Sequence, residues 1–176
     1  INYITQYTSS FKHFSVKRKK MDPKPETIYA GLIGSGCNIG INRIAKTSVG
    51  ISEDTLKNTI NWCFSLKNIQ RANNKVIGVI NKLFLSNAYR HKDEELHTSS
   101  DGRKVNVSVD SLHSNYSYKY FGKGKGVSIY TFIDERQLLF HSTVISASER
   151  EAAYVIDGLQ QNDVVHSTIH STDTHG

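Results

Sequence analysis

The chain has 176 residues, of which 38% are hydrophobic, 22% charged and 10% aromatic, and it contains only 2 prolines. This length suits one domain, or one domain with an appendage, and the composition excludes collagen-like, low-complexity and wholly disordered chains. No apolar run approaches the roughly 18 residues that a membrane-spanning helix needs. The two cysteines, Cys37 and Cys63, fit no disulfide or metal framework. We therefore expect a cytoplasmic protein.

The net charge of +6 is concentrated in the first part of the chain. Residues 1–25 carry six basic side chains and a single acidic one, whereas the rest of the chain holds 16 basic and 15 acidic side chains. A basic arm of this kind can bind nucleic-acid phosphates by displacing their counterions, or it can be a solvated surface. The sequence leaves both interpretations open. The basic residues of the arm are Lys12, Lys17, Arg18, Lys19, Lys20 and Lys24.

Composition and hydrophobic pattern divide the chain into three parts. Two prolines mark a linker after the basic arm, because proline restricts its own backbone and that of the preceding residue. We expect an arm and linker in residues 1–26, a helical region in residues 27–92 and a region of strands and helix in residues 93–176. The chain begins with Ile1 rather than Met and ends with Gly176 in a polar stretch, so we expect a fragment of a longer protein.

Apolar residues recur every three or four positions from residue 27 to about residue 89, which is the periodicity of amphipathic helices. The first helix is expected to end at Gly34–Gly36, because glycine disfavours a helix interior. Ser52 precedes two acidic residues and predicts the start of a further helix by side-chain capping. The apolar stripes are Ile28, Leu32 and Ile33; Ile41, Ile44 and Ala45; Leu56, Ile60, Cys63 and Phe64; and Val76, Val79, Ile80, Leu83 and Phe84.

The pattern changes to that of strands after about residue 91. Valines alternate with polar residues over Val105–Val109, which is the period of a half-buried strand. Two β-rich runs, Val127–Ile133 and Leu138–Ile145, flank Asp134–Arg136 and predict a hairpin.

A helix and a last strand are expected to follow this hairpin. Ser148 and Glu151 have the spacing of a capping box, and the helix that they begin should end near Asn162. Val164–Ser171 then has the character of a strand. The predicted order of strand, strand, strand, helix and strand makes this an α+β fold with a mixed sheet.

Two polar segments, Thr98–Gly102 and His170–Gly176, are interpreted as turns at strand ends, and they contain Asp101 and Asp173. Carboxylates at the ends of neighbouring strands repel one another unless a cation lies between them. Oxygen ligands favour magnesium or manganese, and two such ions roughly 3.5–4 Å apart can stabilise the attacking and leaving oxygens of phosphoryl transfer. Each aspartate alone is a weak signal, because aspartate is a common residue of turns, and an Asx-turn or a helix cap is then the favoured interpretation.

Other patterns point less clearly to a site. Gly34–Gly40 looks like a nucleotide-binding loop, but it follows a helical pattern and lacks both the P-loop lysine and the GxGxxG spacing. His166, His170 and His175 gather near the C-terminus, but zinc ligation requires a tighter set with cysteine or more regular spacing. The sequence does not place His141, which belongs to the second strand of the hairpin.

Basic residues near the first aspartate and in a glycine-rich turn are candidates for DNA contact. Arg103 and Lys104 follow Asp101 closely, and three lysines lie among aromatic residues of the turn. Such residues would contact phosphates and position DNA without reading its sequence. The alternative is a hairpin with solvated lysines and half-buried tyrosines. The turn contains Lys119, Lys123 and Lys125 with Tyr116, Tyr118, Tyr120 and Phe121.

Longer stretches of the sequence resemble a known protein family. The segments YAGLIGSGCNIGINRIAK, TSSDG, GVSIYTFIDERQLLFHSTVI, REAAYVIDGL and STDTHG follow one another between residues 29 and 176. In these segments the chain resembles the transposases of bacterial class II replicative transposons, the Tn-three (Tn3) family. The resemblance covers most of the chain, and several of the segments are specific.

This resemblance implies a helical segment followed by the first part of an RNase H-like core with an Asp-Asp-Glu (DDE) triad, here in residues 93–176. The first aspartate of the triad corresponds to Asp101 by its SSDG setting, and the second to Asp173 by its TDT setting. The family's glutamate lies well downstream of the second aspartate, beyond this chain. Glu149 and Glu151 lie upstream of Asp173 and do not replace it.

The resemblance also implies a mechanism. Asp101 and Asp173 would bind two divalent metal ions, magnesium or manganese, which assist hydrolysis of a phosphodiester at each transposon end and transfer of the 3′-hydroxyl into target DNA. The DNA partners would be the terminal inverted repeats and the target, with self-association of the intact protein at the bacterial nucleoid. Without the glutamate, we expect the isolated chain to be weak or inactive.

Three hypotheses follow for the chain as a whole. The favoured one is a part of a metal-dependent transposase catalytic region. The second is a truncated, inactive remnant that binds only DNA or protein. The third is an unrelated mixed α/β binding domain, which would place Asp101 and Asp173 far apart.

Overall fold

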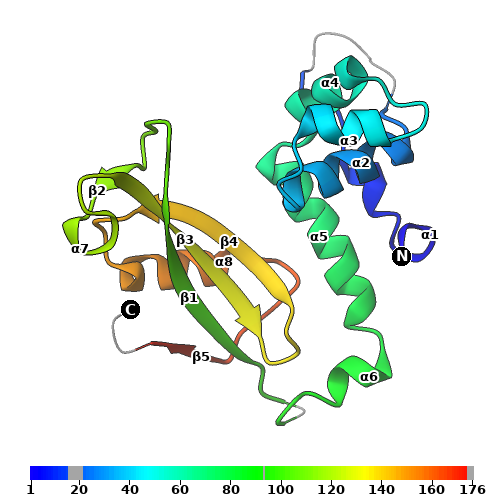
Figure 1. The fold of residues 1–176 in the computed structure, drawn as a ribbon. Coiled ribbons are helices and arrows are strands. Elements are labelled where there is room, and N and C mark those ends of the chain that lie inside the picture. The colour runs from blue at the N-terminus through cyan, green and yellow to red at the C-terminus, as the bar shows by residue number, and fades with distance from the viewer. Residues whose placement is uncertain (16–21, 93, 174–176) are drawn as a thin grey trace. The chain divides into compact units, whose positions relative to one another are not determined.

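The structure, a computed structural model, describes residues 1–15, 22–92 and 94–173. The chain forms two compact units, Ile1–Val79 and Ile80–Gly176, each of which is described by itself (Figure 1). Four of the six basic residues of the arm lie outside the described residues, namely Lys17, Arg18, Lys19 and Lys20. His175 also lies outside them. The second unit contains the segment from Ile80 to Lys92 in addition to the sheet.

The first unit is helical, as the apolar periodicity predicts. Its core contains Phe11, Ile28, Cys63 and Ala72, and the rings of Phe11 and Phe64 lie 4.8 Å apart between centroids. Burial of these apolar side chains is the main force that holds the helices together. The elements are α1 (Asn2–Thr5), the 3-10 helix η1 (Tyr7–Ser10), α2 (Pro25–Gly36), α3 (Ile41–Thr47), α4 (Glu53–Cys63) and α5 (Leu66–Ile80).

Two predicted helix boundaries in this unit are confirmed. The hydroxyl of Ser52 accepts a hydrogen bond of 3.2 Å from the amide of Thr55, so Ser52 caps α4 as expected. Helix α2 ends at Gly36, within the predicted segment Gly34–Gly36, and Cys37 follows as its C-cap. A Cβ at Gly34 would lie 2.9 Å from Cγ2 of Ile44, so the glycine permits close packing of α3 on α2.

The second unit contains a mixed sheet. Strand β3 (Lys125–Asp134) pairs antiparallel with β1 (His97–Asn106) and with β4 (Leu139–Ser146), whereas β5 (Ile169–Thr172) pairs parallel with β1. The order across the sheet is therefore β4, β3, β1, β5, and the short β2 (Asn115–Tyr116) also pairs with β3. The predicted hairpin is confirmed, and so is the α+β class with an RNase H-like arrangement of three antiparallel strands, a helix and a parallel strand.

The helices of this unit are short, and one of them packs closely on the sheet. Helix α8 lies against one face of the sheet (Figure 1), where a Cβ at Gly158 would overlap the ring of Phe132. Phe132 is fully buried, its ring lies 4.9 Å from that of Tyr130 between centroids, and Ile145 is also buried in this unit. The helices are α6 (Phe84–Asn87), α7 (Tyr118–Phe121), the 3-10 helix η2 (Glu151–Tyr154) and α8 (Val155–Gln160).

The predicted capping box does not form. The chain enters η2 through Arg150, which makes no side-chain cap, and Glu151 instead accepts a 3.0 Å hydrogen bond from the hydroxyl of Ser128 on β3. The hydroxyl of Ser148 bonds to Asn115 at 2.8 Å. Both side chains of the expected capping box therefore form hydrogen bonds with residues that are distant in the sequence, Ser148 with Asn115 and Glu151 with Ser128.

The polar segment Thr98–Gly102 is part of β1 and not a turn, contrary to the prediction. Thr98 and Ser100 are buried there, because their hydroxyls are hydrogen-bonded inside the unit. The strand ends at Asn106, before the alternating valines are complete. The last strand is also shorter than predicted, since it begins only at Ile169.

Candidate catalytic site

The pairing of β1 with β5 sets the positions of the two predicted aspartates. The parallel register pairs Ser99 with Ser171 and Ser100 with Thr172. The pairing ends there, and Asp101 and Asp173 are the residues that follow this last pair on the two segments, so both lie at the same end of β5.

Asp101 and Asp173 also line one pocket, with a volume of about 640 Å³, where β5 ends and β1 continues. Both aspartates are exposed. One carboxylate oxygen of Asp101 accepts a 2.8 Å hydrogen bond from the amide of Gly102. The structure therefore brings the two aspartates together, which is the opposite of what an unrelated binding domain was expected to show.

Charged side chains surround the aspartates in this pocket. Two predicted DNA-binding residues, Arg103 and Lys104, line it. Sequence reasoning did not assign three further lining residues, Tyr120, Glu149 and Arg150, to the site. The nearest sequence signal for Arg150 was the run of charged residues after β4, which we interpreted as a helix start.

Lys104 is held inside the pocket by two neighbours. Its ammonium lies 3.7 Å from a carboxylate oxygen of Glu151 and 4.6 Å from the centre of the Tyr120 ring. A Cβ at Gly102 would overlap the carboxylate of Glu151, so the glycine leaves room for this contact. Lys104 thus lines the pocket with a restrained side chain, whose charge is paired with that of Glu151.

The three lysines of the glycine-rich turn do not line this pocket. Lys119 lies on α7, with its ammonium 5.2 Å from the centre of the Tyr120 ring, and Lys123 lies in the following loop. Lys125 begins β3 and makes a 2.7 Å ion pair with Asp110, and this hydrogen bond raises the pKa of Lys125. The turn is a separate basic and aromatic surface, with Tyr118 largely exposed beside the lysines.

A buried polar network joins β1 to β5 beneath the aspartates. The ring of His170 lies 2.8 Å from the hydroxyl of Thr98 through Nδ1 and 2.9 Å from the hydroxyl of Ser100 through Nε2. Ser100 continues to the hydroxyl of Tyr130 at 2.6 Å, and Thr98 to that of Ser167 at 2.6 Å. Burial lowers the pKa of His170, and His97 lowers it further.

The other histidines have different surroundings. His141 is 6% exposed and packs edge-on against Phe132, so it belongs to the core and not to the pocket. Burial lowers its pKa, although Asp157 partly opposes the shift. Within residues 1–15, 22–92 and 94–173, no group of three histidine, cysteine or acidic side chains is arranged to hold a metal ion.

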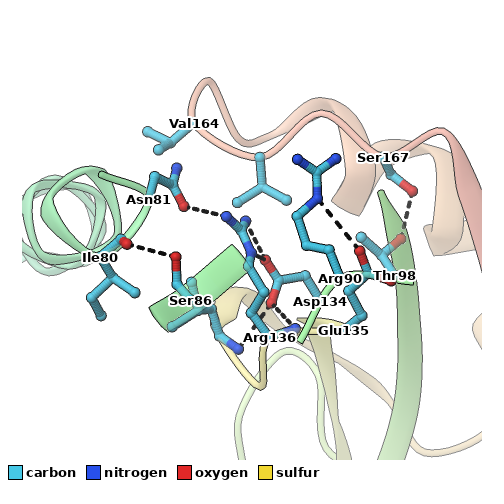
Figure 2. Close-up of polar contacts among 12 residues, drawn as sticks. Ile80, Asn81, Ser86, Arg90, Thr98, Asp134, Glu135, Arg136, Val164 and Ser167 are labelled. Carbon is cyan, nitrogen blue, oxygen red and sulfur yellow. Dashed lines mark hydrogen bonds and ion pairs between the residues drawn. The ribbon is translucent and has the colours of Figure 1, made fainter. Parts of the chain in front are cut away.

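A second polar cluster holds the turn of the hairpin, Asp134–Arg136, between β3 and β4. The carboxylate of Asp134 is fully buried and accepts a 2.8 Å hydrogen bond from Nε of Arg136, whose Nη1 donates to Asn81 at 2.7 Å (Figure 2). Arg90 lies 3.7 Å from Glu135 in the same cluster. These contacts join the hairpin to the segment before β1, and their role is structural.

The pair of aspartates suits a divalent cation by its chemistry. Carboxylate oxygens are the ligands that magnesium and manganese prefer, and these ions commonly keep water or phosphate oxygens as further ligands. Two carboxylates supply part of such a coordination shell.

None of the helices in the described part of the chain is long and apolar enough to cross a membrane.

Comparisons with known proteins give a consistent result. The family model described as Tn3 transposase DDE domain matches residues 1–176. The chain is 29% identical over 177 residues to the transposase for transposon Tn1546 of Enterococcus faecium, covering 100% of the chain and 18% of that protein. It is 24% identical over 181 residues to the transposase for transposon gamma-delta of Escherichia coli strain K12, with 100% and 18% covered.

A third relative, the transposase for transposon Tn501 of Pseudomonas aeruginosa, is 22% identical over 175 residues, which cover 98% of the chain and 17% of the relative. The chain thus spans less than a fifth of the length of these proteins. What the similarity establishes is confined to the matched region.

Proposed function

Because the chain belongs to the family of Tn3 transposase DDE domains, we propose that Asp101 and Asp173 are the two aspartates of a DDE triad in a DNA transposase. The observation that carries this proposal is their common pocket beside the β1–β5 pair, with Arg103 and Lys104 at its wall. Acidic groups for a cation and basic groups for a phosphate meet there in one place.

The proposed reaction is cleavage of a phosphodiester at each transposon end, followed by strand transfer. Water first displaces the flanking strand and leaves a 3′-hydroxyl, and this hydroxyl then displaces a target-strand oxygen as it forms the new phosphodiester. Two divalent ions, magnesium or manganese, supply activation of the attacking oxygen and stabilisation of the leaving oxygen when bound. Asp101 and Asp173 hold them, and no covalent bond to the protein forms.

DNA is the proposed partner, and the basic side chains supply its phosphate contacts. Arg103 and Lys104 would bind phosphates next to the cleaved bond, and so would Arg150, which lines the same pocket. Lys119, Lys123 and Lys125 would hold a flanking stretch of the duplex. In the whole protein the DNA would be the terminal inverted repeats and the target, bound by a self-associated transposase at the nucleoid.

The third carboxylate of the triad is proposed to come from a glutamate after Asp173. Glu151 is a poor candidate, because it already contacts Lys104 and accepts a hydrogen bond from Ser128. On this proposal, residues 93–176 are the first part of the catalytic core, residues 27–92 a helical region before it, and residues 1–26 a basic arm. The isolated chain would cleave DNA weakly or not at all.

The second candidate function is binding of DNA or protein without chemistry. It is favoured by the lack, among the described residues, of any third acidic or histidine side chain beside the two aspartates in a metal-binding arrangement. Under this alternative the aspartates could be replaced without loss of function.

Cleavage of transposon-end DNA by the longer transposase that contains this chain distinguishes the two candidates. We expect Asp101→Asn and Asp173→Asn each to reduce Mg²⁺-dependent nicking by at least about a thousandfold, since a bound metal ion contributes several kcal/mol to the reaction. Asp163→Asn, at an exposed aspartate of the same unit, is the matched control and should keep activity. Nicking that survives either site substitution would overturn the proposal.

A further inference from the structure

We propose that His170 is a positioning residue, which fixes the register of β5 against β1 and thereby sets Asp173 beside Asp101. The proposal about register stands on contacts of the described residues alone. Only the consequence for the metal-binding pair rests on the proposed function.

The contacts of the imidazole define one alignment of the two strands. His170 is the register partner of Thr98, and its two ring nitrogens contact the hydroxyls of Thr98 and Ser100 at 2.8 and 2.9 Å. These hydroxyls lie two positions apart on one face of β1, because side chains of a strand alternate between its faces. A slip of β5 by one residue turns the ring to the other face, and a slip by two removes it from one hydroxyl.

Two other contacts also favour this register, one of 2.7 Å between the hydroxyl of Ser171 and Nε2 of His97, which is exposed, and one of 2.7 Å from the amide of Leu96 to the hydroxyl of Thr168, just before β5. Apolar packing adds little to them. The strand has only four residues, and Ile169, Ser171 and Thr172 are all exposed. Register is strongly specified where one face of a strand is buried and apolar, and weakly specified elsewhere. In β5 the partly buried side chain is His170, whose ring also stacks on Phe132 with centroids 5.9 Å apart.

The consequence concerns the aspartates directly. In the observed register Ser100 and Thr172 are the last pair, and Asp101 and Asp173 are the residues that directly follow them. A slip by two residues would instead bring Asp101 opposite Ser171 and move Asp173 away. The histidine network would thus determine whether two carboxylates or one reach the same cation.

The test is a disulfide trap of register in the full chain. Ser99→Cys with Ser171→Cys reports the observed register, because these residues are partners, and Ser99→Cys with Ile169→Cys reports a slip by two. The exposed Cys37 is replaced by serine in every variant. Each cysteine pair is introduced into three versions of the chain, which carry His170, His170→Leu or His170→Gln. The yield of each disulfide on oxidation is then compared.

His170→Leu is chosen because it keeps apolar volume against Phe132 and removes both hydrogen bonds. It leaves no buried hydroxyl without a partner, since Thr98 still contacts Ser167 and Ser100 still contacts Tyr130. His170→Gln retains an amide that can bond one of the hydroxyls. Circular dichroism checks that each variant is folded.

With His170 we expect the in-register disulfide to form about fivefold more than the slipped one, because a slip by two residues costs one of the two hydrogen bonds. His170→Leu should bring this ratio close to one, and His170→Gln should restore a part of it. An unchanged ratio in His170→Leu would overturn the proposal. If His170→Leu does not fold, an unchanged ratio in His170→Gln together with unchanged amide exchange of β5 would overturn it as well.

Binding of Mn²⁺ to the same variants separates this proposal from the proposed function. If His170 sets the pair, His170→Leu should weaken Mn²⁺ binding about tenfold, and His170→Gln should weaken it less. If the parent chain binds no Mn²⁺ while the register ratio still depends on His170, the two-aspartate site fails and the register role stands.

Discussion

Single residues in the second unit have roles that depend on close contacts. At Gly102 a Cβ would overlap the Glu151 carboxylate. We expect Gly102→Ala to lower the free energy of unfolding by about 1–3 kcal/mol, the usual cost of overpacking. Denaturation in urea measures this, and Gly78→Ala in α5 is the control, because a Cβ there meets nothing within 4 Å.

The control should change stability in the opposite direction, by up to about 1 kcal/mol, since alanine favours a helix more than glycine does. In a Glu151→Ala background the loss from Gly102→Ala should largely disappear, because the overlapping group is gone. Equal losses with and without Glu151 would contradict this explanation of the glycine.

Two histidines make the stability of the second unit depend on pH. Burial lowers the pKa of His141 and of His170 from the ordinary value of 6.5. The folded state therefore binds protons less readily than the unfolded chain, so stability is full above about pH 6.5 and falls as the pH drops below it. We expect the free energy of unfolding to decrease between pH 7 and pH 5.

Unfolding by urea at a series of pH values measures this dependence. His141→Gln should make it shallower, whereas His166→Gln, at an exposed histidine, should leave it unchanged. Stability that rises on acidification, or a slope that the His141 substitution leaves intact, would show that these rings are not held in the neutral form.

At the scale of elements, the hairpin of β3 and β4 depends on its buried ion pair. Arg136 is 7% exposed and Asp134 is completely buried, so removal of the guanidinium would leave a carboxylate without its charge partner (Figure 2). We expect Arg136→Ala to cost about 3–5 kcal/mol in unfolding free energy. Lys92→Ala, which breaks an exposed pair with Glu95, should cost less than about 1 kcal/mol.

Thermal or urea unfolding of both variants measures the comparison. A small effect of Arg136→Ala would mean that water can reach Asp134 and solvate it. A large effect of Lys92→Ala would mean that the exposed pair contributes more than its exposure allows.

The elements that were predicted correctly from the sequence are those with strong local signals. The cap at Ser52 and the hairpin about Asp134–Arg136 depend on neighbouring residues, so the sequence displays them directly. The start of β1 was missed because its inward side chains are hydroxyls, whose burial depends on partners such as His170 and Tyr130 that lie far away in the sequence. No hydrophobic pattern marks such a strand.

At the scale of the whole molecule, the candidate site also combines residues that the sequence indicates with residues that only the fold brings to them. Resemblance located Asp101 and Asp173, and both line one pocket, while their role in a triad stays a prediction. Arg150 and Tyr120 could not be assigned, because each reaches the pocket from a loop or helix that is remote in sequence from both aspartates. Glu151 was expected to cap a helix and instead contacts Lys104 across the sheet.

The account of the molecule depends most on whether the two aspartates share one cation. Titration of the isotopically labelled chain with Mn²⁺, followed by paramagnetic broadening of amide signals, tests this directly. We predict that signals next to Asp101 and Asp173 broaden together, and that Asp101→Asn or Asp173→Asn abolishes both effects. Broadening at one aspartate alone, or at both but unaffected by these substitutions, would contradict a shared site.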